Sequence, residues 1–209
     1  QQHGVSSDDR PELERGSMAM RFFVADLQPD RPVKGGERLD VGDYAFEVIW
    51  TPGHAPGHVC LYEVNRKLLL TGDHVLPSIT PNVSLHPQQS ENPLADFLAS
   101  LERVAALPVE RMLPAHEWDI DWFKRRVEEL RAHHSARLDD MLAAVGKEGA
   151  VTAMDVARRV TWATGSYESF PAWMKRAAIG EALSHLVYLV SRGRLARREE
   201  GGRVLFQAA

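Results

Sequence analysis

The alternation of hydrophobic and polar residues becomes regular only after residue 43 of the chain. Phe46, Val48 and Trp50 lie two residues apart, which predicts a strand that stops at the following proline turn. The apolar run over 67–73 has hydrophobic residues on both faces, so we expect that strand to lie inside a sheet. Strands are predicted over 33–44, as two short edge pieces, and over 44–50, 59–64 and 67–73.

A helical period follows a long loop that contains four prolines, 74–93. Asn92 and Pro93 are typical of a helix cap and first turn, and apolar residues at helical spacing continue to about residue 107. The segment RMLPAHE, 111–117, predicts a short buried strand. The order of strand, loop, helix and strand indicates an α/β architecture.

Near residue 120 the predicted order of strands and helices gives way to a mainly helical pattern. A charged helix is predicted to about residue 145, followed by shorter helical segments and by two β-like runs around Gly201-Gly202. Three helices closed by a hairpin describe a winged-helix domain. We therefore expect two domains, 1–130 and 131–209.

Composition narrows the class of protein. The 209 residues are 44% hydrophobic and 26% charged, as in ordinary globular proteins. Cys60 is the single cysteine and lies in an apolar run, which excludes an internal disulfide and suits a reducing cytosol. No apolar run reaches the roughly 20 residues of a membrane span and no leader opens the chain, so we expect a cytoplasmic protein without a membrane partner.

Three residues could carry chemistry together. His54, Asp73 and His116 each follow a predicted strand at a turn marked by glycine or proline, and ligands bind at the carboxyl ends of strands in α/β sheets. Two imidazoles and a carboxylate suit Zn²⁺, with iron and manganese as alternatives. Each residue alone is more often a solvated side chain or a turn residue. The combination predicts a metal site.

The motifs TPGHAPGH, LLLTGDH and LPAHE, in this order, resemble the second half of the metallo-β-lactamase-fold hydrolases. The segments GDHVLPSITPNVSL and HLVYLVSRGRL are similar to the branch with a C-terminal winged helix. This resemblance implies an α/β fold: a partial αββα sandwich, its second half, followed by an α+β winged-helix domain. It also implies a metal-dependent hydrolase with one or two zinc ions, in which metal-bound hydroxide attacks an ester, thioester or phosphodiester.

The resemblance also implies roles for individual residues. His54 resembles a ligand of the first metal, Asp73 a carboxylate that bridges both metals, and His116 a ligand of the second. His58 matches a position that orients the metal ligands without binding the metal itself. His74 could reach substrate or hydrogen-bond a ligand, the alternative being a solvated loop residue. No catalytic residue is assigned in this chain.

One part of the family pattern is absent. The His-x-His-x-Asp-His run that supplies most of the metal ligands does not occur, so each metal would keep two ligands and be under-occupied. Apolar residues at 59–62 and 68–70 would also leave a sheet face open to water. We therefore expect the chain to be an inactive C-terminal part of a longer polypeptide, unless a homo-oligomer partner covers that face.

Several alternatives stay open at this point. For an enzyme, an acyl thioester and single-stranded RNA are the leading substrates. A second hypothesis is an endoribonuclease or a nucleic-acid-binding winged-helix module on a degenerate hydrolase scaffold, since residues 133–209 hold 11 Lys/Arg against 8 Asp/Glu. Glu199 and Glu200 dilute the charge of the hairpin arginines. A third is structural, with the appended helices forming a dimer or a wall of the cleft. Its aromatic candidates are Trp162, Phe170, Trp173 and Tyr188.

Overall fold

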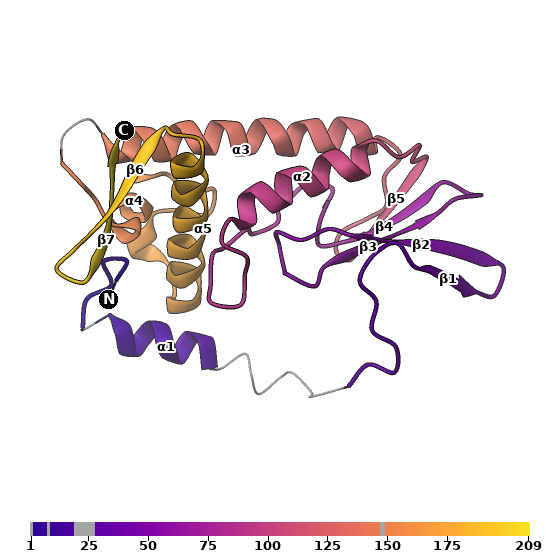
Figure 1. Cartoon of the computed structure of the whole chain (residues 1–209), viewed down its shortest axis with the longest axis horizontal. Helices are drawn as coiled ribbons and strands as arrows, with labels where there is room; N and C mark the ends of the chain where they lie inside the picture. The colour runs from indigo at the N-terminus through magenta and orange to yellow at the C-terminus, as the bar shows by residue number, and fades with distance from the viewer. Residues whose placement is uncertain (1, 8, 19–27, 147–148) are drawn as a thin grey trace. The chain divides into compact units, whose positions relative to one another are not determined.

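The computed structural model describes residues 2–7, 9–18, 28–146 and 149–209 (Figure 1). The chain divides into two compact units, one of residues 29–135 and one of residues 136–209 with the described part of 1–28. The first residues therefore do not join the front domain, which differs from the predicted span of 1–130. The cause is backbone pairing, because the amide of Met154 donates to the carbonyl of His3 at 3.1 Å, and that of Val204 to Gln2 at 2.7 Å.

A five-stranded sheet forms the centre of the unit 29–135. Its strands lie side by side in chain order, antiparallel from β1 to β4, and β5 adds parallel to β4. The parallel step needs a crossover, which the helix α2 provides. The strands are β1 (Arg38–Val41), β2 (Tyr44–Trp50), β3 (Val59–Glu63), β4 (Leu68–Gly72) and β5 (Arg111–Pro114).

The helix α2 (Pro93–Ala105) has one apolar face, which is buried in the core of this unit. The side chain of Asn92 caps it by accepting the amide of Ala95 at 3.2 Å, and Pro93 begins the first turn, as the sequence predicts. The buried residues recur every three or four positions, so they share one face. They are Leu94, Phe97, Leu101 and Val104, all 0% exposed.

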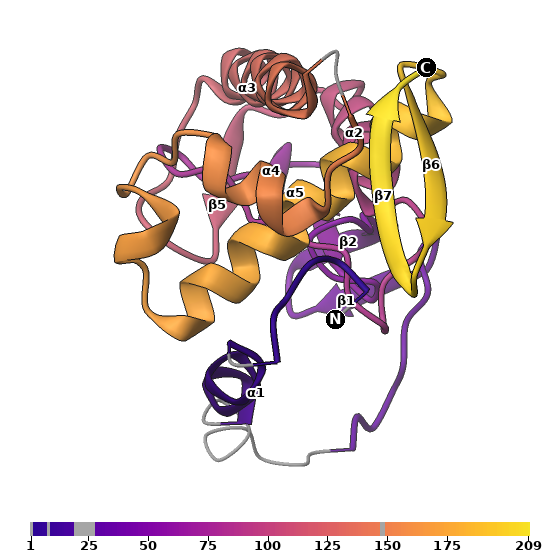
Figure 2. The same ribbon diagram turned by 90° about the vertical axis from the view of Figure 1, so that its left-hand side faces the viewer.

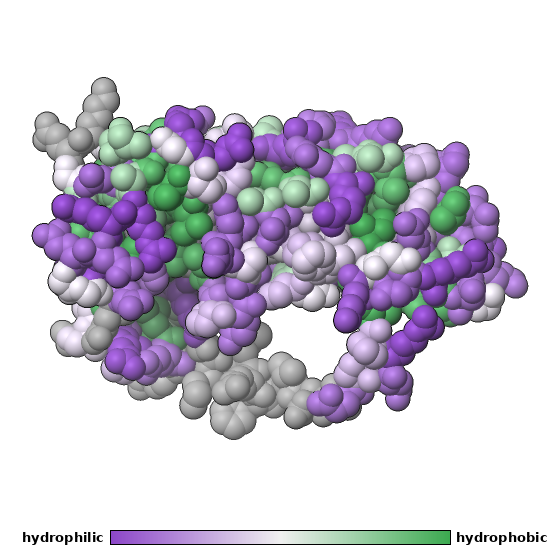
Figure 3. Space-filling model, viewed as in Figure 1, coloured by the Kyte–Doolittle hydropathy of each residue, from purple (hydrophilic) through white to green (hydrophobic). Residues whose placement is uncertain are grey.

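The two faces of the sheet differ in burial. Cys60, Tyr62 and Leu69 point to one face and are at most 4% exposed. Leu61 and Leu70, which pair across β3 and β4, point to the other face and are only half-buried. In the space-filling view, hydrophobic patches interrupt the hydrophilic surface (Figure 3). The expectation of an apolar sheet face that is only partly covered within this chain therefore has support in the exposure of these residues.

The thiol of Cys60 should be unreactive toward thiol reagents in the folded protein. It is 0% exposed, lies 3.5 Å from the Thr51 hydroxyl, and burial raises its pKa to about 12. Because the thiolate is the reactive form, we expect no reaction with an aromatic disulfide reagent at pH 8 until the protein is unfolded in denaturant. Full labelling of the native protein within minutes would contradict this environment.

The second unit combines helices with a β-hairpin. The hairpin packs against α5, and α1 and α4 contact the same helix (Figure 2). Val151 pairs with Phe206 of the hairpin, so a third short extended segment adds to it. The elements are α1 (Arg10–Met18), α3 (Phe123–Val145) from residue 136 onward, α4 (Ala153–Arg159), the 3₁₀ helix η2 (Tyr167–Ser169), α5 (Ala172–Ser191), β6 (Leu195–Glu200) and β7 (Arg203–Ala208).

Local signals explain where the elements of the second unit begin. Thr152 and Asp155 form a reciprocal capping box at the start of α4, which satisfies two backbone amides that the helix leaves free. The hairpin turns at Gly201 and Gly202, both with positive φ, as the Glu-Gly-Gly sequence predicts. Within the described ranges, no helix has the length and hydrophobicity that a membrane span requires.

Candidate metal centre

The sheet topology brings the three predicted ligands to one edge. Two successive antiparallel pairings make β2 and β4 run in the same direction, and β5 is parallel to β4. The carboxyl ends of these three strands therefore point the same way. His54, Asp73 and His116 lie in the turns that follow them, so strands distant in sequence deliver their side chains to one place.

Asp73 lies between the two imidazoles. Its Oδ2 is 3.7 Å from His54 Nε2, and its Oδ1 is 3.2 Å from His116 Nε2. The Asp73 side chain is 33% exposed, yet its Oδ1 atom is buried and has no hydrogen-bond partner among the residues that the structure describes. A buried carboxylate oxygen without a donor costs free energy unless something else satisfies it.

The His54 ring is oriented with its Nε2 toward Asp73. Its Nδ1 lies 2.9 Å from the carbonyl oxygen of Asn82, which can only accept, so the ring proton belongs on Nδ1. In a neutral ring this tautomer leaves the lone pair on Nε2, the nitrogen that faces Asp73. Gln89 fixes the backbone of the same turn, because its side-chain amide donates to the carbonyls of Gly53 and His54 at 3.0 Å each. A neutral imidazole oriented by a carbonyl is the usual state of a metal ligand.

His58 supports Asp73 through the backbone. Its Nε2 accepts the amide of Asp73 at 3.1 Å, and its Nδ1 donates to the hydroxyl of Thr51 at 2.8 Å. Gly72 leaves room for this contact, since a Cβ at that position would lie 2.6 Å from His58 Nε2. Burial lowers the pKa of His58, and the nearby His54 lowers it further, which favours the neutral ring that these two bonds require.

Replacing His58 with leucine should lower the free energy of unfolding by about 1–3 kcal/mol, because the amide of Asp73 and the hydroxyl of Thr51 lose their partner. Urea denaturation followed by tryptophan fluorescence measures this change. His86→Leu is the control, since the side chain of that histidine lies on the surface and, among the residues described, bonds only to Gln88. Equal unfolding free energies for both variants would show that His58 does not hold Asp73.

His74 is a core residue. It is 0% exposed and packs edge-on against Phe97, with ring centroids 4.9 Å apart. Burial lowers its pKa to about 3, so the ring is neutral at physiological pH. Neither ring nitrogen has a partner at hydrogen-bond geometry in the described part of the chain, although the backbone of Ser100 lies near it. A fully buried ring is not a solvated loop residue and presents no surface to a substrate.

The donor set fits a divalent metal in kind and in spacing. Two ligand atoms on one tetrahedral zinc lie about 3.3 Å apart, which follows from metal–ligand bonds of roughly 2 Å. The two distances at Asp73, 3.7 and 3.2 Å, bracket that value. The number of ligands is short, because the described part of the chain contains no group of three or more His, Cys, Asp or Glu residues arranged to hold a metal.

Several supporting residues escaped the sequence analysis. Asn82, Gln89 and Thr51 act through hydrogen bonds to backbone or ring atoms, and such bonds carry no recognisable spacing. The available signal was the length of the loop 74–93, since loops this long are often functional, but length does not identify which residues contribute. The structure shows that this loop orients His54.

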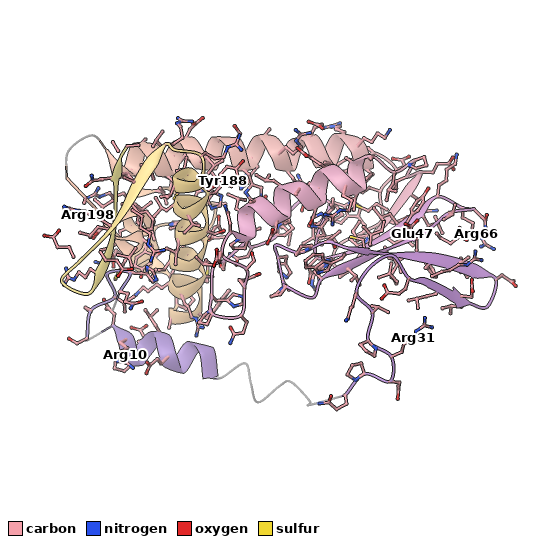
Figure 4. All side chains as sticks on the ribbon, viewed as in Figure 1. Arg10, Arg31, Glu47, Arg66, Tyr188 and Arg198 are labelled. Atoms are coloured by element: carbon pink, nitrogen blue, oxygen red, sulfur yellow. The ribbon has the colours of Figure 1, made fainter. Side chains whose placement is uncertain are left out.

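The hairpin of the second unit is close to electrically neutral. Arg197 pairs with Glu199 at 3.0 Å, and Arg198, labelled in Figure 4, pairs with Glu200 at 3.1 Å. Of the aromatic candidates, Trp162 and Phe170 pack against each other with ring centroids 6.4 Å apart. Trp173 is 61% exposed and is therefore not a core residue.

Comparison with known proteins places these features in a family. The model of the metallo-beta-lactamase superfamily matches residues 3–116. A metallo-beta-lactamase family protein of Thermus thermophilus is 35% identical, with a TM-score of 0.74 over 87% of this chain and 55% of its own. A beta-lactamase domain protein of Burkholderia ambifaria is 30% identical, with a TM-score of 0.77 over 100% of this chain and 57% of its own.

Curated relatives agree with this placement. The lactamase-like protein vrtG of Penicillium aethiopicum is 28% identical over 95% of this chain and 64% of its own length. The acyl-coenzyme A thioesterase MBLAC2 of Homo sapiens is 31% identical over 48% of this chain and 36% of its own. The chain thus spans less than two thirds of the length of these relatives. It belongs to the metallo-beta-lactamase superfamily, whose members are metal-dependent hydrolases.

Proposed function

We propose that the protein is a metal-dependent hydrolase whose metal centre includes His54, Asp73 and His116. The observation that carries this proposal is the buried Oδ1 of Asp73, which has no hydrogen-bond partner among the described residues and faces His116 at 3.2 Å. Zinc is the proposed metal, with iron or manganese as alternatives, because imidazole and carboxylate suit all three. A divalent metal bound there would supply Lewis acidity and an acidified water.

The residues of this chain would each perform a separate task at the centre. The Asp73 carboxylate would neutralise positive charge of the metal centre. One of its oxygens faces each imidazole, so the orientation of the carboxylate matters for both histidines. The bond to Asn82 would keep the His54 Nε2 lone pair available by holding the proton on Nδ1. His58 would keep the Asp73 turn in place through the backbone amide.

An acyl thioester is the substrate class that we propose, with other esters and phosphodiesters as alternatives. The resemblance to a human acyl-coenzyme A thioesterase over 105 residues supports this choice. Single-stranded RNA is the second candidate. The pairing of Arg197 and Arg198 with neighbouring glutamates counts against it, because self-neutralised arginines attract phosphates weakly. We further propose that the helices and hairpin of the second unit form a winged helix that does not read nucleic acid.

The remaining metal ligands would come from outside the described residues of this copy of the chain, either from a preceding segment or from a second copy. Two observations support this. The described residues contain no group of three or more His, Cys, Asp or Glu side chains that could hold a metal by themselves, and Leu61, Leu68 and Leu70 are only half-buried on one sheet face. A partner that covers this face could also complete the metal site. Light scattering on the metal-loaded protein distinguishes the sources. A monomer of these 209 residues with stoichiometric metal would contradict both.

The substrate proposal is tested by parallel assays on the purified protein supplied with zinc, iron or manganese. Release of free coenzyme A from a short acyl thioester is expected, and Asp73→Asn should abolish it. Cleavage of a fluorescent single-stranded RNA should stay at background. RNA cleavage that depends on Asp73, without thioester hydrolysis, would overturn the thioester proposal in favour of the endoribonuclease.

A further inference from the structure

Glu117 adopts a backbone conformation that glutamate rarely takes. Its φ is +72°, in the left-handed region where a side chain is strained and where glycine is the usual residue. It follows directly after His116. A strained residue beside a proposed ligand indicates that its side chain does something that glycine could not do.

The carboxylate of Glu117 binds the loop that follows the other ligand. Its Oε2 accepts the amide of Ser78 at 2.8 Å, and its Oε1 accepts the Ser78 hydroxyl. A weaker contact of 3.5 Å reaches the amide of Ile79. These hydrogen bonds, those from Ser78 first, lower the pKa of the Glu117 carboxyl, so it stays ionised.

This contact joins the two turns that carry Asp73 and His116. Ser78 lies five residues after Asp73, and the amide of Ala115 donates to the carbonyl of Gly72 at 3.0 Å. Arg126 holds the same loop from α3, since its guanidinium donates to the carbonyls of Leu76 and Ile79 at 2.7 and 2.9 Å. The Ser78 end of the contact is thus fixed, and Glu117 ties the His116 turn to it.

The His116 ring needs such an anchor. It is 65% exposed, and no hydrogen bond joins it to any residue that the structure describes, so its 3.2 Å contact with Asp73 is what directs the ring. His54, in contrast, is oriented by the carbonyl of Asn82. The position of the His116 ring therefore depends on its backbone, which Glu117 fixes one residue later.

We infer that Glu117 is a positioning residue that aims His116 at the metal by tying its turn to Ser78. This inference rests on the proposed metal centre. It explains why a strained glutamate occupies a position that suits glycine, because glycine would relieve the strain and release the loop.

Glu117→Gly separates positioning from a purely structural role, because the two roles predict different results. If Glu117 positions His116, zinc affinity should fall about 10–100-fold, as for other residues that orient metal ligands. The free energy of unfolding should change little, since relief of the positive φ offsets the loss of the hydrogen bonds from Ser78. A residue that only stabilises the fold would lower the free energy of unfolding and leave the zinc affinity of the folded protein unchanged.

The experiment measures zinc affinity with a competing chelator and unfolding with urea for Glu117→Gly, Glu117→Gln and Ser78→Ala. The glutamine variant keeps an acceptor for the Ser78 amide and should lose less affinity than glycine. The double variant of Ser78→Ala and Glu117→Gly should bind no more weakly than Glu117→Gly alone. Asp121→Asn is the charge-matched control, and it should bind zinc like the original protein. Unchanged affinity in Glu117→Gly would overturn the inference.

A measurement on the metal-free protein keeps the inference separate from the proposed function. Backbone order parameters from NMR relaxation at His116 should fall in Glu117→Gly from about 0.85 toward 0.6 and stay high in Asp121→Asn. An unchanged order parameter would overturn the inference even if zinc binds. If the original protein binds no metal, the proposed function fails. The order parameter of His116 still decides in that case whether Glu117 fixes His116.

Discussion

Gly53→Ala is expected to destabilise the unit 29–135 by about 4 kcal/mol, from backbone strain and overpacking together. The φ of Gly53 is +129°, and an added Cβ would lie 2.5 Å from the Cα of Phe97 and closer still to its Cβ. Those atoms belong to the middle of α2, so relief would require the helix to move. Because His54 follows directly, the same movement should displace a proposed ligand.

Gly57→Ala provides the matched control within the same segment. No described heavy atom lies within 4 Å of a Cβ added at Gly57, so the change in unfolding free energy should stay within about 0.5 kcal/mol. Urea denaturation of both variants, followed by tryptophan fluorescence, measures the difference. Similar unfolding curves for the two variants would show that Gly53 does not pack against α2 as the structure describes.

Asp73→Asn should weaken zinc binding by more than about 100-fold, which exceeds the usual effect of a residue that merely supports a ligand. Asp73 faces both imidazoles, so its loss removes a shared ligand and the local negative charge together. Asparagine has nearly the same shape, and its backbone amide can still donate to His58. The fold should therefore survive, and competition with a chelator measures the affinity.

Asp121→Asn again serves as the control for this substitution, because it removes one negative charge from an exposed residue of the same unit. Its zinc affinity should match that of the original protein. Loss of affinity in both variants would point to a general electrostatic effect. Retention of affinity in Asp73→Asn would remove Asp73 from the metal centre.

Strongly periodic segments could be predicted from the sequence, and weakly periodic ones could not. The alternation at Phe46 and Val48 and the cap at Asn92 depend only on neighbouring residues. The structure confirms the strand β2 and the helix α2 that they predict. The helix α1 has no apolar stripe to predict it, and Leu13 is its buried hydrophobic anchor among the residues described. Its place in the second unit depends on pairing with residues far along the chain, which local patterns do not encode.

The residues of the candidate site could likewise be predicted from local sequence, but their arrangement in space could not. His54, Asp73 and His116 could be found because glycine and proline mark the turns that carry them. Their placement at one edge depends on the direction of β2, β4 and β5, which the sequence order alone does not determine. The burial of His74 escaped prediction because its neighbour Phe97 comes from a helix that begins 19 residues later.

The most direct test of the metal centre is anomalous X-ray diffraction from crystals grown with zinc, recorded on both sides of the zinc absorption edge. The account predicts a peak about 2.0–2.2 Å from an oxygen of Asp73 and from Nε2 of His54 or His116. A zinc peak at other residues, with none beside Asp73 at saturating zinc, would contradict the central claim.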